Sequence, residues 1–153
     1  TRRSSDLMKY LKQSLKVLCL LALASSAFAQ THEVLMKNRG SAGPMVYEPD
    51  YLEIQPGDTV KFIRKHKSHN AASIAELSPA DYPGFMGKID EEIEVTYDNP
   101  GFYGIKCSPH YAQGMVMMIK VGDTTLPDSY RAFKAPGIAD KRFQEIYARI
   151  DKQ

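Results

Sequence analysis

The segment FYGIKCSPHYAQGMVMMIKV, residues 102–121, contains two runs of strand-forming residues joined by a short polar loop. The first run, residues 102–107, ends on a cysteine, and the second, residues 115–121, is almost wholly apolar. A short apolar run of this kind is typical of a central strand in a sheet. The segment therefore predicts two consecutive strands of a β protein, with a polar loop between them.

Earlier stretches of the chain alternate apolar and polar side chains with the period of two that a half-buried strand requires. They are residues 33–38, 51–54, 59–64 and 93–97. Turn-forming residues lie between them, as in Pro56-Gly57-Asp58 and Asn99-Pro100-Gly101. Several short strands separated by turns favour a β-sandwich or a barrel over residues 30–123.

The last thirty residues follow a different pattern. Phe143, Ile146, Tyr147 and Ile150 are spaced i, i+3, i+4, i+7, which predicts an amphipathic helix. Residues 127–134 predict a shorter helix that begins near a proline. We therefore expect residues 124–153 to form a helical extension of the same domain.

The first 29 residues resemble a secretory signal peptide. Five basic residues lie within residues 2–16, an apolar stretch follows at 17–24, and Ala27-Phe28-Ala29 provides a cleavage site. The apolar stretch is shorter than the roughly 20 residues that a membrane-spanning helix needs, and a buried core helix is the alternative. We expect export to the periplasm, with no membrane attachment after cleavage.

The composition describes one ordinary globular domain. Of 153 residues, 43% are hydrophobic and 25% charged, and the formal net charge is +2, too small to indicate a nucleic-acid partner. Without residues 1–29, the chain has 15 basic and 17 acidic residues and a formal charge of −2. Only one of its two cysteines, Cys107, then remains, so the exported chain forms no internal disulfide.

The loop after residues 102–107 contains a possible metal-binding motif. Cys107, His110 and Met115 are spaced C-x2-H-x4-M, so one short loop carries a thiol, an imidazole and a thioether. A thiolate, two imidazoles and a weak axial methionine form the blue-copper electron-transfer site. The second imidazole must come from elsewhere, and His32, His66 and His69 are the candidates between which periodicity does not decide.

Other interpretations of the same residues are simpler. A lone cysteine is often a small buried hydrophobe, and methionine is often core filler. Zinc prefers stronger ligands than methionine. A Cys–His nucleophile pair needs an orienting group and an oxyanion hole, neither of which the sequence indicates. A copper carrier or storage protein remains the main alternative, although one cysteine in a strand-to-strand loop argues against it.

The chain resembles the pseudoazurin family of small periplasmic cupredoxins from about residue 31 to its C-terminus. The resemblance implies a Greek-key β-sandwich with two C-terminal helices and one type 1 copper per chain. It selects the histidine before Asn70, so that the implied ligands are His69, Cys107, His110 and Met115. The matching segments are MVYEP at 45–49, PGDTV at 56–60, HN at 69–70, PG at 100–101, KCSPHYA at 106–112, GM at 114–115 and VGD at 121–123.

The resemblance also implies the surroundings of the copper. The backbone N–H of Asn70 is the expected hydrogen-bond donor to the thiolate, and Pro109 removes a possible second donor. Met45 and Pro109 are expected to surround an exposed edge of His110. Gln113 departs from the family pattern, in which a methionine is common; it lies between two of the implied ligands in the sequence, so the departure concerns the edge of the partner surface and not the copper site.

The implied function is the transfer of single electrons, Cu(II)/Cu(I), by a monomeric protein that is not an enzyme. A basic rim is expected around His110, which implies a transient complex with an acidic redox protein. The resemblance suggests a copper nitrite reductase or a c-type cytochrome enzyme as that partner. The expected rim consists of Arg39, Lys67, Lys88 and Lys106.

Overall fold

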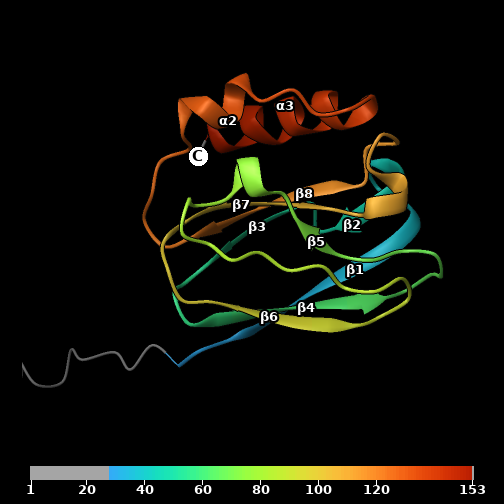
Figure 1. The fold of residues 1–153 in the computed structure, drawn as a ribbon, viewed down its shortest axis with the longest axis horizontal. Helices are drawn as coiled ribbons and strands as arrows, with labels where there is room; N and C mark the ends of the chain where they lie inside the picture. Colours follow the sequence, from blue (N-terminus) through green and yellow to red (C-terminus); the bar gives the residue numbers. More distant parts are fainter. Residues whose placement is uncertain (1–27, 153) are drawn as a thin grey trace, which may run out of the picture.

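The computed structural model describes residues 28–152, in which two four-stranded sheets pack face to face (Figure 1). One sheet has the order β2-β1-β4-β6 and the other β3-β8-β7-β5. The strands are β1 (Thr31–Gly40), β2 (Gly43–Glu48), β3 (Tyr51–Ile54), β4 (Asp58–Arg64), β5 (Ala72–Ser73), β6 (Ile93–Tyr97), β7 (Gly101–Lys106) and β8 (Val116–Val121). Strands β1 and β4 are parallel, as are β3 and β8, so both sheets are mixed.

The apolar character of β8 has a structural reason. Its residues alternate between two clusters of buried side chains, because successive residues of a strand point to opposite faces. Met117, Ile119 and Val121 belong to the cluster between the sheets, whereas Val116 and Met118 belong to the cluster beneath the helices. The strand is therefore covered on both faces, which is why its sequence shows no polar alternation.

Helices α2 (Asp128–Ala132) and α3 (Ile138–Ile150) form a third layer over the β3-β8-β7-β5 sheet (Figure 1). The face of α3 that carries Phe143, Ile146 and Tyr147 is buried against this sheet, as its spacing predicts. The predicted β-sandwich with two C-terminal helices is thus confirmed. Two short 3-10 helices, η1 (Ala75–Leu77) and η2 (Ser108–His110), complete the structure.

Two strands lack a sequence signal. Strand β2 contains a proline, and its Met45 has a φ of +50°, so no regular alternation is visible there. Strand β5 has only two residues, fewer than any periodicity can reveal. The ends of the other strands agree with the predicted ranges to within two residues.

The N-terminal prediction falls mostly outside the described part of the chain. Residues 1–27, which contain nearly all of the predicted signal peptide, lie outside the described residues. Within residues 28–152, no helix is long and apolar enough to cross a membrane.

Candidate metal centre

Three potential metal-binding atoms meet at one end of the sandwich. The Nδ1 atoms of His69 and His110 are 3.1 Å apart, and they lie 3.8 Å and 3.5 Å from Sγ of Cys107. His69 and Cys107 are buried, whereas His110 is half-buried. His69 follows β4, Cys107 follows β7 and His110 ends η2, so the site joins loops from both sheets.

The triangle fits a metal ion of the expected kind. A point equidistant from the three atoms lies about 2.0 Å from each of them, and ordinary metal–nitrogen and metal–sulfur bonds are about 2.0–2.3 Å long. Two imidazoles and a thiolate are the equatorial ligands of a blue-copper site. The donor set that the structure brings together therefore suits copper.

Met115 lies at the end of the same loop and is fully buried in the cluster that contains Cys107. Its backbone is tied to both other ligands of the loop: its N–H donates to the carbonyl of His110 at 3.1 Å, and its carbonyl accepts from the N–H of Cys107 at 3.0 Å. A thioether in this position is the weak axial ligand that copper accepts and zinc does not favour.

His69 is oriented by Asn38, a residue that the sequence analysis missed. Nε2 of His69 donates to Oδ1 of Asn38 at 2.7 Å, which leaves Nδ1 unprotonated and free to bind a metal. The N–H of Asn38 in turn donates to Nδ1 of the exposed His66 at 3.1 Å. Burial lowers the pKa of His69, and the neighbouring His110 and His66 act in the same direction. The imidazole is therefore neutral at neutral pH.

The buried side chain of Asn70 connects three segments around the site. Its Nδ2 donates to the carbonyl of Gly87 at 2.9 Å and to Oγ of Ser108 at 3.2 Å, and its Oδ1 accepts from the N–H of Ser108 at 2.7 Å. Its own carbonyl accepts from the hydroxyl of Tyr47 at 2.7 Å. The loop of His69 is thereby held against the loop of Cys107.

Burial raises the pKa of the Cys107 thiol, and hydrogen bonds from the backbone N–H groups of Asn70 and His110 oppose this effect. The His110 N–H is a donor that the sequence analysis did not include. A buried thiol with a raised pKa is a weak nucleophile at neutral pH, because only the thiolate attacks. A bound cation would instead favour the thiolate, so the environment suits metal binding and not thiol catalysis.

The remaining histidines lie outside the triangle. Nε2 of His32 lies 2.9 Å from Oδ2 of the buried Asp58, an interaction that occupies its ring. His66 contacts the site only through Asn38. Asn38 is separated from His69 by 31 residues. The parallel pairing of β1 with β4 brings the two side chains together, and no local sequence pattern indicates that pairing.

The predicted surface residues lie on segments next to the site. Arg39 follows Asn38, Lys67 lies two residues before His69, and Lys88 follows Gly87, whose carbonyl binds Asn70. These three side chains are exposed. Lys106 is half-buried, with its Nζ 5.1 Å from the centre of the Tyr111 ring. Pro109 is exposed and Met45 half-buried.

Comparisons with known proteins agree with this geometry. Residues 34–122 match the family of copper binding proteins of the plastocyanin/azurin type. The chain is 41% identical over 133 residues to pseudoazurin from Paracoccus pantotrophus, covering 86% of this chain and 92% of that protein. It is 36% identical over 137 residues to pseudoazurin from Methylorubrum extorquens, covering 85% and 90%. The crystal structure of pseudoazurin from Hyphomicrobium denitrificans superposes with a TM-score of 0.74 at 38% identity, covering 78% of this chain and 97% of that one.

The chain therefore belongs to the plastocyanin/azurin family of copper-binding proteins and, within it, to the pseudoazurins. Its cofactor is type 1 copper, held by His69, Cys107, His110 and Met115. The predicted cupredoxin-like Greek-key sandwich is confirmed, as is the prediction of a non-enzymatic copper protein.

Proposed function

We propose that the protein carries single electrons in the periplasm between redox proteins. The observation that supports this most directly is the arrangement of the ligands, with a buried thiol and imidazole behind a half-buried His110. Copper held by this donor set supplies a one-electron couple between Cu(II) and Cu(I). The protein's own residues would supply a fixed geometry, a dry environment and an exit at the surface.

The environment of Cys107 favours a high reduction potential. Burial disfavours the charged oxidised centre relative to the neutral reduced one, and N–H groups that donate to the thiolate act in the same direction, because their dipoles direct positive charge towards the centre. The N–H groups of Asn70 and His110 provide such hydrogen bonds. Pro109 has no N–H and so limits their number. Burial and these donors together would raise the potential, and the missing N–H of Pro109 would limit the increase.

His110 is the proposed exit for the electron. It is half-buried, and the neighbouring Pro109 and Ala112 are exposed; together with Met45 they form the proposed apolar surface around its ring. The four basic residues of the proposed rim form no ion pair within 4 Å in the described part of the chain, whereas Lys37, Lys61 and Lys120 each pair with a glutamate. A basic rim without internal partners suits a transient complex with an acidic redox protein.

A visible absorption spectrum tests the copper centre first. The chain without residues 1–29 is given one equivalent of Cu(II), and the spectrum is measured before and after ascorbate. An intense band that bleaches on reduction and returns on oxidation supports a copper–thiolate redox centre. A colourless product, or copper that ascorbate removes from the protein, contradicts electron transfer and favours a carrier or storage role.

Salt dependence tests the partner. We expect association rates with an acidic copper nitrite reductase or an acidic c-type cytochrome to fall steeply between low and physiological ionic strength. Charge reversal at Lys67 or Lys88 should reduce the rate, and reversal at Lys141, which lies on α3 and pairs with Glu145, should change it little. A rate that is insensitive to salt and to charge reversal at Lys67 and Lys88, or that falls as much on reversal at Lys141, contradicts the proposed rim.

A further inference from the structure

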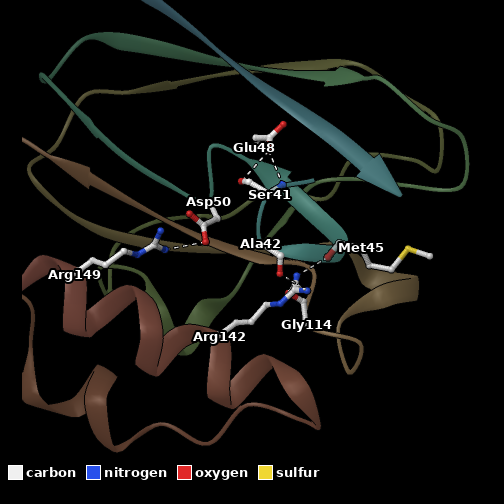
Figure 2. Close-up of polar contacts among 8 residues, drawn as sticks. All are labelled: Ser41, Ala42, Met45, Glu48, Asp50, Gly114, Arg142 and Arg149. Carbon is white, nitrogen blue, oxygen red and sulfur yellow. Dashed lines mark hydrogen bonds and ion pairs between the residues drawn. The ribbon is translucent and has the colours of Figure 1, made fainter. Parts of the chain in front are cut away.

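One arginine of the C-terminal helix reaches the copper end of the sandwich. Nη1 of Arg142 donates to the carbonyl oxygens of Met45 at 2.7 Å and Gly114 at 2.9 Å, and Nη2 donates to that of Pro44 at 2.7 Å and more weakly to that of Ala42 at 3.5 Å. Figure 2 shows the side chain rising from α3 into the space between the turn that follows β1 and the end of the ligand loop.

These contacts differ from those of a surface arginine on the same helix. Arg149 makes an ordinary ion pair, with Nη2 2.8 Å from Oδ2 of Asp50 (Figure 2). Among the described residues, Arg142 has no carboxylate within 4 Å and donates only to main-chain carbonyls. The planar guanidinium presents several donors in a fixed arrangement, so it holds the carbonyls at defined positions relative to one another.

The carbonyls belong to segments that matter at the site. Gly114 directly precedes Met115, the axial ligand, and Met45 is a member of the apolar surface proposed around His110. Met45 has a φ of +50°, a conformation that non-glycine residues rarely adopt and that the surrounding structure must stabilise. The hydrogen bond from Arg142 to its carbonyl supplies part of that stabilisation.

The beginning of α3 contacts the same loop a second time. The N–H of Ile138 donates to the carbonyl of Ala112 at 2.9 Å. Gly137, with a φ of +57°, lies so close that a Cβ atom would be 2.4 Å from that carbonyl oxygen. The helix therefore binds the ligand loop at Ala112 and, through Arg142, at Gly114.

We propose that Arg142 is a positioning residue of the copper site. By binding Gly114 and Met45 together, it fixes the axial end of the ligand loop against the apolar surface around His110, and so controls the reduction potential and the visible spectrum. This inference rests on the proposed electron-transfer function. It assigns the C-terminal helix a role in the site in addition to covering the sheet.

The test compares three variants with the parent protein. Arg142→Met removes the charge and all the hydrogen bonds, Arg142→Lys keeps the charge but loses the planar fork, and Arg149→Met is the matched control on the same helix. Amide hydrogen exchange is measured in the metal-free proteins at Gly114 and Met115, whose N–H groups donate to the carbonyls of Tyr111 and His110. The copper-loaded proteins give the reduction potential and the intensity ratio of the visible bands.

We expect exchange at Gly114 and Met115 to accelerate about tenfold or more in both Arg142 variants, because the loop loses its anchor and opens locally more often. The band ratio and the potential should change in both, and all three readouts should stay at parent values in Arg149→Met.

Two results would overturn the proposal. One is parent-like exchange and spectra in both Arg142 variants. The other is a potential that shifts in Arg142→Met but not in Arg142→Lys, with unchanged exchange, which would mean that the charge alone acts. If the parent protein holds no redox-active copper, the electron-transfer proposal fails, yet the exchange measurement still decides whether Arg142 positions the loop. If Arg142→Met does not fold, Arg142→Lys decides.

Discussion

Replacing Asn70 by alanine should weaken the whole copper end of the sandwich. The substitution removes the hydrogen bonds of Nδ2 to the Gly87 carbonyl and of Oδ1 to the Ser108 N–H, with N···O distances of 2.9 and 2.7 Å, and a weaker contact of 3.2 Å to Oγ of Ser108. It leaves the backbone N–H of residue 70, the donor to Cys107, in place.

The magnitude follows from what is left behind. Each of the two shorter hydrogen bonds contributes about 1 kcal/mol net, and a buried polar group left without a partner costs about 1–3 kcal/mol. Gly87 is buried, whereas Ser108 is exposed and water can replace the lost partner of its N–H. We therefore expect Asn70→Ala to lower the free energy of unfolding by about 2–4 kcal/mol.

Urea denaturation of the metal-free protein measures this difference. With a slope of about 2 kcal/mol per molar urea, the midpoint should fall by about 1–2 M. Ser108→Ala is the matched control, since it removes only the weak contact and should change the free energy by less than about 1 kcal/mol. A loss below about 0.5 kcal/mol in Asn70→Ala, or equal losses in both variants, would refute the reasoning.

Three further substitutions address the ligands and the opposite end of the molecule. Asn38→Ala removes the acceptor of His69 Nε2 and should weaken copper binding about 10–100-fold in competition with a chelator; unchanged affinity would contradict its orienting role. Met115→Gln should lower the reduction potential and keep a coloured site, as measured by spectroelectrochemistry, and an unaltered potential would count against Met115 as axial ligand. Burial raises the pKa of Asp58, but two backbone N–H groups and the His32 ring outweigh it and hold that pKa below its usual value. A lowered pKa stabilises the fold in full above the unfolded value near pH 4, and this contribution is lost as the pH falls from there through the folded pKa. Asp58→Asn should therefore destabilise most at neutral pH, and the difference should shrink over that lower range; a difference independent of pH would refute this.

The contiguous part of the site could be predicted from the sequence because a single loop contains it. Cys107, His110 and Met115 lie within nine residues between two strands, so a short loop must bring them together. His69 required the family resemblance. It lies in the irregular stretch after β4, which also contains His66, and no periodicity distinguishes the two histidines as ligands.

The residues that orient the ligands could not be predicted in the same way. Asn38 meets His69 only because β1 and β4 run parallel, a pairing that local patterns do not encode. Arg142 follows the same principle, since its partners are carbonyl oxygens of residues up to 100 positions away. Every residue has a carbonyl, so no sequence feature marks the four carbonyls that Arg142 binds. In the helical pattern of α3, Arg142 is one of several basic residues outside the apolar face.

Copper removal should leave the fold intact, because the core does not depend on the ligands. The two clusters of buried side chains contain 25 residues, of which only Cys107 and Met115 bind copper. The ligand loop is closed by its own backbone hydrogen bonds. The side chain of Asn70 binds this loop at Ser108, and the side chain of Asn38 binds His69, and neither contact needs an ion. This differs from small zinc domains, in which metal binding supplies the folding free energy. We expect the metal-free protein to keep its far-ultraviolet circular dichroism and a cooperative thermal transition, with copper raising the midpoint by mass action. A metal-free protein without a cooperative transition would show that the ligands, and not the sandwich core, determine the stability of this end of the molecule.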